Sequence, residues 1–170
     1  MVYNVNMKRF LMVTVIMMAS LVALPVNAIS KNQKNAIVDH CDLIRNSLKS
    51  TQKADARTRV YLGGYYETIL SNYIVPLNVR LVENNLSTAE LVENQNKFAE
   101  VKTLFANDYV GYQQGLEELV SINCKEDPEE FYNQLNIVRQ KRKAVEQDTL
   151  RIRNLISEHV KLVNQLKRKM

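Results

Sequence analysis

The chain has 170 residues, and its 23 Lys and Arg against 18 Asp and Glu give a formal net charge of +5. This mild basic excess identifies no class of partner, and no nucleic-acid recognition module is readable in the sequence. With no Trp, four Gly and three Pro, the chain has long stretches free of helix-breaking residues. The composition therefore predicts an all-α protein with few, long helices.

Residues 1–28 have the pattern of a secretory signal peptide. Lys8 and Arg9 precede an uncharged run at 10–24, and the segment ends on the small residue Ala28. This order predicts cleavage after Ala28. The apolar run is shorter than the about 20 residues that a membrane-spanning helix needs, and an uncleaved anchor is the alternative. We expect a single mature domain at 29–170, secreted or otherwise extracytoplasmic.

The first helix of the mature chain is expected at 31–83. Apolar residues recur at spacings of three and four over most of its length, and the pattern weakens at 50–56. Gly63, Gly64 and Pro76 mark places for a bend, because glycine loosens a helix and an interior proline removes a hydrogen bond. One bent helix is the first interpretation, and two helices split near Gly63 are the alternative.

The second helix has a clear start and a regular buried stripe. Asn84 and Asn85 end the first helix, and Ser87 with Glu90 has the pattern of a capping box. The helix should stop near Cys124. Its apolar residues recur every seven positions, as in coiled coils: Leu91, Phe98, Phe105, Tyr112 and Leu119.

The third helix is expected from Asp127 to the C-terminus. Asp127 is a favoured N-cap, Pro128 suits the first helical position, and the acidic residues that follow face the positive end of the helix dipole. The fold class predicted is thus an elongated antiparallel three-helix bundle, similar to a coiled coil. The stripe of this helix comprises Phe131, Leu135, Val138, Val145, Ile152, Ile156, His159, Val163 and Leu166.

Cys41 and Cys124 are expected to form a disulfide. Two helices that turn back near Asn85 bring residues side by side when their numbers have a nearly constant sum, because both arms rise by about 1.5 Å per residue. The two cysteine numbers have their midpoint next to that turn. A redox-active pair is the weaker interpretation, since the CxxC spacing is absent.

The same register aligns each residue of the third helix with the residue of the first helix numbered about 87 lower. It places Asp55, Asp108 and Arg142 in one layer, each at a position where its stripe favours an apolar residue. We expect an Asp–Arg–Asp cluster that fixes the helix register, with a ligand site as the alternative. The register also places His159 near Asn72 or Tyr73, as a packed core histidine.

Four tyrosines gather around Gly63 and Gly64. Two small residues would let a facing helix approach, and the rings would fill the groove beside them. Ordinary core packing is the first interpretation, and an aromatic recognition patch is the alternative. The four residues are Tyr61, Tyr65, Tyr66 and Tyr73.

Three segments, 58–68, 76–81 and 123–132, resemble small exported helical proteins of Saccharibacteria-type bacteria. The resemblance would cover most of the mature chain. It implies a location at the bacterial envelope or outside the cell, and it implies no activity. In general shape the chain is also similar to periplasmic chaperones of the Skp and Spy types, although it lacks the Spy signature and a β core.

No catalytic motif, phosphate loop or metal-ligand spacing is present in the sequence, so we expect neither an enzyme nor a cofactor. The expected function is a non-catalytic scaffold or interaction protein at the bacterial cell surface or envelope, with a protein or an envelope polymer as partner. An extracytoplasmic chaperone that binds unfolded clients is the alternative. The third helix is rich in Lys and Arg. This basic face either binds an anionic partner or is simply exposed to solvent.

Overall fold

The computed structural model describes residues 29–86 and 88–169, and the expected signal peptide lies outside them. Within these ranges the chain forms helices and no strand, so the all-α prediction is confirmed. The elements are α2 (Lys31–Asp39), α3 (Cys41–Ile69), the π-helical turn η2 (Leu70–Ile74), α4 (Val75–Glu83), α5 (Ala89–Ser121) and α6 (Pro128–Lys169).

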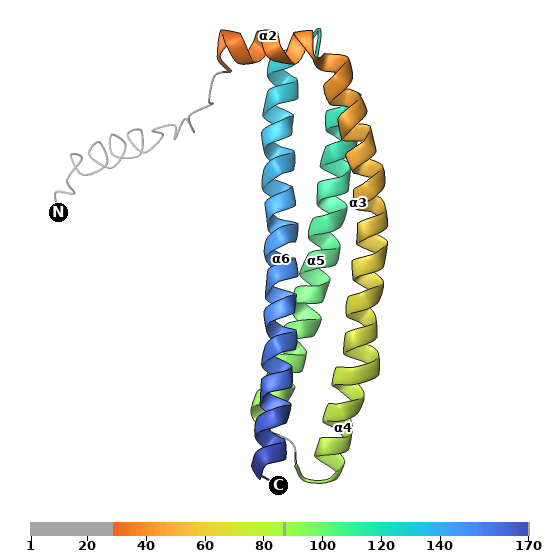
Figure 1. The fold of residues 1–170 in the computed structure, drawn as a ribbon, viewed down its shortest axis with the longest axis vertical. Coiled ribbons are helices and arrows are strands. Elements are labelled where there is room, and N and C mark those ends of the chain that lie inside the picture. Colours follow the sequence, from red (N-terminus) through yellow and green to blue (C-terminus); the bar gives the residue numbers. More distant parts are fainter. Residues whose placement is uncertain (1–28, 87, 170) are drawn as a thin grey trace, which may run out of the picture.

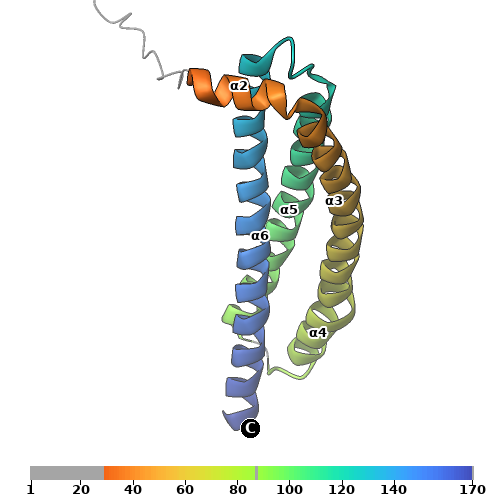
Figure 2. The ribbon, with the colours of Figure 1, turned by 45° about the horizontal axis from the view of Figure 1, so that its top comes forward.

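Three long arms stand side by side in the rod (Figure 1). The first is α3 with η2 and α4, the second is α5 and the third is α6. In both views the C-terminal half of α5 lies between the other two arms, whereas its beginning crosses behind α6, and α3 is set away from α6 (Figure 2). The closest backbone packing joins α5 and α6. The cavities described below therefore flank α3.

A short separate helix, α2, lies across the end of the rod, where we expected the start of one helix at 31–83 (Figure 2). Ser30 caps α2 through a reciprocal capping box with Gln33, and the helix ends at His40. Ile37 is buried against the core. Because α2 ends at His40 and changes direction there, it covers the end of the core, which a straight continuation of α3 would leave open to water.

The helix α3 continues without interruption through Gly63 and Gly64, so the alternative of two helices split near Gly63 is wrong. Its irregular turn is η2, directly before Pro76. Pro76 has no N–H and its ring collides with the carbonyl four residues earlier in a regular α-helix. The wider π-helical turn takes up this misfit, so proline decides where the arm is irregular and glycine does not.

The first reversal of the chain is a Schellman motif, a common way to end a helix. Asn84 is the C-cap, and Asn85 has a φ of 57°, in the left-handed region that asparagine tolerates. The N–H of Leu86 donates to the carbonyl of Leu81 at 2.8 Å, and that of Asn85 to Val82 at 3.0 Å. The expected end of the first arm is confirmed in atomic detail.

The start of α5 differs from the predicted capping box. Thr88 is the N-cap, and its hydroxyl accepts a hydrogen bond from the N–H of Leu91 at 3.3 Å. Ser87 lies outside the described residues. The start of α6 follows the prediction, because Pro128 is its first residue and the carbonyl of Asp127 accepts from the N–H of Phe131 at 3.0 Å.

The predicted stripe of α5 forms the centre of the core. All five of its residues are at most 2 % exposed, and the rings of Phe105 and Tyr109 meet edge to face at 5.4 Å. On α6, the buried members of the predicted stripe are Phe131, Val138, Val145, Ile152 and His159. The seven-residue spacing therefore identified the buried face of α5, and five of the nine residues in the stripe predicted for α6 are buried.

The disulfide between Cys41 and Cys124 is present, with 5.6 Å between the two Cα atoms. Side-chain contacts between the first arm and α5 with the loop that follows it stay near the expected register over most of the hairpin, since the residue numbers in each pair add up to between 165 and 173, with the highest sum next to the turn. These pairs are Asp42 with Lys125, Arg45 with Val120, Asp55 with Tyr112, Glu67 with Lys102 and Asn78 with Gln95.

Across 29–86 and 88–169, none of the helices is long and apolar enough to span a bilayer.

Candidate functional site

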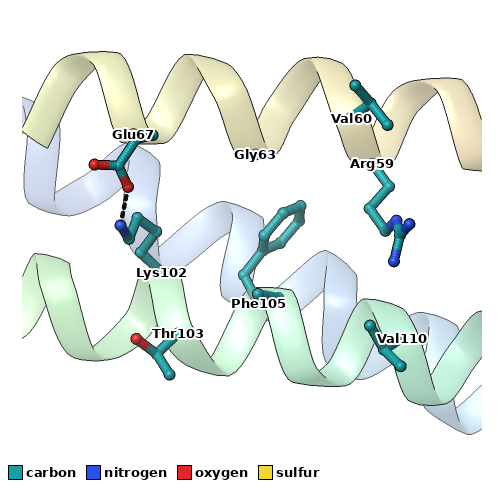
Figure 3. A pocket seen from close by; sticks show the side chains of 9 residues that line it. Arg59, Val60, Gly63, Glu67, Lys102, Thr103, Phe105 and Val110 are labelled. Carbon is teal, nitrogen blue, oxygen red and sulfur yellow. Dashed lines mark hydrogen bonds and ion pairs between the residues drawn. The ribbon is translucent and has the colours of Figure 1, made fainter.

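A groove lies between α3 and α5, and we call it the Gly63 groove. Its volume is about 540 Å³. The ring of Phe105 points from α5 toward α3 and forms its floor (Figure 3). A Cβ atom placed on Gly63 would meet no other atom within 4 Å, so the absence of a side chain there opens the groove. Its remaining apolar lining consists of Val60, Ala106 and Val110.

Charged side chains border the Gly63 groove at both ends (Figure 3). At one end Lys102 forms an ion pair with Glu67, which also accepts a hydrogen bond from Ser71. The hydrogen bond from Lys102, followed by that from Ser71, lowers the pKa of Glu67. At the other end Arg59 lines the groove, and none of the ion pairs between described residues includes it. The groove is thus apolar in the middle, with a cation available at one end.

The four predicted tyrosines divide between two environments. Tyr66 is buried, and its ring meets that of Phe105 edge to face at 5.2 Å. Burial raises its pKa. Tyr61, Tyr65 and Tyr73 are at least half exposed, and the rings of Tyr61 and Tyr65 stack at 6.5 Å. Core packing therefore accounts for Tyr66, and the other three lie on the surface of the first arm.

The two glycines do not serve the close helix approach that we expected of them. Neither Gly63 nor Gly64 has any neighbouring atom within 4 Å of an added Cβ. The facing helix stays far enough away to leave a groove at Gly63, because the Phe105 ring occupies the space between the helices.

The expected Asp–Arg–Asp cluster does not form as ion pairs. Arg142 is exposed, although it lines the same cavity of about 360 Å³ as Asp55. Two tyrosines of α5 satisfy Asp55 instead: Tyr112 donates to its carboxylate at 2.6 Å, and Tyr109 donates to its backbone carbonyl at 2.8 Å. Burial, and then the bond to Asp55, raise the pKa of Tyr112. Hydroxyl groups rather than a guanidinium thus fasten α3 to α5 at this level.

Asp108, the third member of that expected layer, lies beside Asp148 of α6. Asp148 is 2 % exposed, and sequence reasoning missed it. One of its carboxylate oxygens accepts from Arg151 at 3.2 Å, while the other is buried without a partner. Burial raises the pKa of Asp148, and the nearby negative charge of Asp108 raises it further. The α5–α6 interface thus contains two neighbouring carboxyl groups, and the burial of Asp148 disfavours its charged form.

Replacing Asp148 with Asn should stabilise the protein at neutral pH by on the order of 1 kcal/mol, because it removes a buried charge. A carboxyl with a raised pKa in the folded state loses its stability contribution as pH rises from the unfolded value through the folded one. The advantage of Asp148→Asn should therefore be largest at neutral pH and shrink toward pH 4. Thermal melts followed by circular dichroism at both pH values measure it.

Glu146→Gln is the matched control, since Glu146 is exposed on the same helix and its replacement removes the same formal charge. It should leave the melting temperature nearly unchanged at both pH values. An equal effect of the two substitutions would show that net charge, and not the buried carboxyl, is responsible.

Nearly all the cations of α6 are exposed, including Arg139, Arg151 and Arg153. No group of three His, Cys, Asp or Glu converges to hold a metal ion in the part of the chain that the structure describes. His159 lies where the register placed it, beside Tyr73 in a cavity between the first arm and α6.

Comparison of the chain with protein-family models, curated proteins and solved structures finds no match.

Proposed function

We propose that this protein is an exported, non-catalytic interaction protein of the bacterial cell envelope, and that its antiparallel three-helix rod presents the Gly63 groove to a protein partner. The groove carries the proposal, because it is an open apolar hollow formed by the absence of a side chain, next to exposed aromatic rings. Concave apolar sites with a few polar groups at their edges are typical of binding surfaces.

The cysteines support the part of the proposal that concerns export. The chain has two cysteines, and they are joined to each other. Structural disulfides form and persist mainly in oxidising compartments, such as the periplasm and the cell exterior. The signal-peptide pattern of residues 1–28 is in keeping with such a location.

The shape and charge of the groove favour a helical partner. An apolar side chain from such a helix would fit into the hollow opposite Gly63, as helix-in-groove complexes use apolar anchors at helical spacing. An acidic residue about one turn away on the partner would meet Arg59 at the open end. The same contact would bury apolar surface of Val60 and Tyr61, which are 70 % and 71 % exposed to water.

The experiment compares wild-type protein with Gly63→Leu and Gly64→Leu. Leucine at position 63 fills the groove, whereas position 64 is exposed and does not line it. Leucine is more favourable than glycine inside a helix by about 0.8 kcal/mol, so neither substitution should unfold the chain. Purified mature protein is used to capture partners from solubilised envelopes, and the affinity for the captured protein is then measured.

We expect Gly63→Leu to weaken binding at least tenfold and Gly64→Leu to leave it unchanged. Equal binding by all three proteins, or no partner at all, would refute the groove as the binding site. The exposed rings of Tyr61, Tyr65 and Tyr73 favour one second candidate, a chaperone for unfolded clients. That function predicts suppressed aggregation of several unrelated clients, with no dependence on position 63.

A further inference from the structure

A cavity to which all three arms contribute is lined by charged groups of both signs that do not pair with each other. Its volume is about 360 Å³, and polar as well as apolar surface of its wall is accessible. Asp55, Arg142 and Glu146 line it, yet none of the ion pairs between described residues includes any of them. The neutral side chains that line it include Thr58, Leu62, Tyr109, Tyr112 and Val145.

One carboxylate oxygen of Asp55 is held in place, and the other is available to a ligand. Oδ2 accepts the hydrogen bond from Tyr112 at 2.6 Å. Oδ1 has no hydrogen-bond partner among the described residues and is not buried, so it is open to solvent. The bond from Tyr112 therefore orients a carboxylate that still has an accessible acceptor.

The hydroxyl groups of this cavity already use their hydrogens within the protein. Tyr112 donates to the carboxylate of Asp55, and Tyr109 donates to the backbone carbonyl of the same residue. Thr58 donates to the carbonyl of Ala54 at 3.1 Å. A hydroxyl group has one hydrogen and two lone pairs, so these three groups can offer a ligand only acceptor oxygens. With the carboxylates of Asp55 and Glu146, they favour a positively charged donor such as an ammonium group.

Arg142 brings the opposite chemistry to the same cavity. It is exposed, and it belongs to α6, whereas Asp55 belongs to α3. A guanidinium presents its N–H groups as a fork that can hold both oxygens of a carboxylate at once. Arg142 and Asp55 line one cavity without forming an ion pair, so a gap separates the two opposite charges. A small molecule that carries both an ammonium and a carboxylate would bridge this gap.

We propose that this cavity binds a free α-amino acid, with the ammonium group donating to Oδ1 of Asp55 and the carboxylate held by Arg142. The side chain of the amino acid would lie against Leu62 and Val145, which supply apolar wall. Taking the roughly 30 Å³ that a water molecule fills in the liquid as a scale, the cavity has room for about twelve non-hydrogen atoms. An amino acid with a side chain as large as that of leucine fits within this limit.

Leucine and two analogues that each lack one of its charged groups are the probes. 4-Methylpentanoic acid is leucine without the ammonium group, and 3-methylbutylamine is leucine without the carboxylate. Each is titrated into the oxidised mature protein, and its affinity is measured by calorimetry. Leucine should bind at least tenfold more tightly than either analogue, because each analogue loses a hydrogen bond between charged groups. Equal affinities of the three compounds, or no binding of leucine, would overturn the proposal.

Two substitutions assign each end of the ligand to its partner in the cavity. Arg142→Gln should remove the preference for leucine over 3-methylbutylamine, because the carboxylate loses its partner. Asp55→Asn should remove the preference for leucine over 4-methylpentanoic acid. Both variants should fold, since Arg142 is exposed and an asparagine at position 55 still has an oxygen that can accept from Tyr112. A preference that survives in either variant would contradict the proposed orientation.

Arg139→Gln is the matched control, because Arg139 is exposed about one turn earlier on α6 and does not line the cavity. It should leave the affinity for leucine unchanged. A loss as large as that of Arg142→Gln would show that net charge is responsible, and it would overturn the proposal. No residue lines both this cavity and the Gly63 groove, so Gly63→Leu should bind leucine as the wild-type protein does. The two proposals can therefore fail separately.

Discussion

Replacing both Cys41 and Cys124 with alanine is expected to lower the free energy of unfolding by about 4.5 kcal/mol, since the bond closes a loop with a sequence separation of 83 residues. The loss arises mainly in the unfolded chain, which gains freedom when the loop is opened. At about 2–4 °C per kcal/mol for a domain of this size, the melting temperature should fall by roughly 9–18 °C. Alanine is used because both sites are buried and a serine hydroxyl would be left without a partner.

Reduction of the wild-type protein provides the internal control. A reductant should lower the wild-type melting temperature by a similar amount and should leave the double alanine variant unchanged. If oxidised wild-type protein and the double variant melted together, the bond would contribute nothing to stability.

The second large effect is expected from Phe105→Ala. The Phe105 ring is 1 % exposed and touches the rings of Tyr66 and Tyr109 edge to face. Removing a buried aromatic ring leaves a cavity and costs about 4 kcal/mol, which corresponds to a fall of roughly 8–16 °C in melting temperature. Chemical denaturation of the oxidised protein, followed by circular dichroism, measures this loss directly.

Leu104→Ala is the matched control for this prediction, because Leu104 is the neighbouring residue on α5 and is 40 % exposed. It should cost less than about 1 kcal/mol. A similar loss at both positions would contradict the central place of Phe105 in the core.

The regular parts of the fold were predictable because long helices repeat one geometric rule. The heptad spacing from Leu91 to Leu119 identified the buried face of α5, and the constant rise of 1.5 Å per residue placed Cys41 opposite Cys124. Asn85 and Pro128 mark helix ends that can be read from the sequence, because asparagine tolerates the left-handed conformation after a helix and proline suits its first position. Register and ends together determined which arms meet at which level.

Features that depend on direction around a helix were not predictable in the same way. Asp55 and Arg142 line one cavity, but an error of one residue in the register turns a side chain by about 100°. Arg142 therefore points to solvent and Asp108 meets Asp148 instead. The break at His40 was not predicted either, because the capping-box pair Ser30 and Gln33 marks only the start of α2 and not its end.

The Gly63 groove and the cavity beside His159 depend on features that carry no strong sequence signal. The Gly63 groove exists because nothing fills the space beside one glycine. The sequence alone does not distinguish such a glycine from one that packs closely against a neighbouring helix. The cavity at His159 is lined in part by Tyr73 and Ile74 of the π-helical turn before Pro76, and the sequence predicted a bend there without its type. Both sites became apparent only from three-dimensional packing.

The sulfur bridge also changes how the rod would respond to tension. It joins the beginning of α3 to the loop after α5, while α6 continues to the opposite end of the rod (Figure 1). A pull applied at residues 29 and 169 would travel from Cys41 directly to Cys124 through covalent bonds. The hairpin between them would stay slack, and only α2, the short loop and α6 could be drawn out.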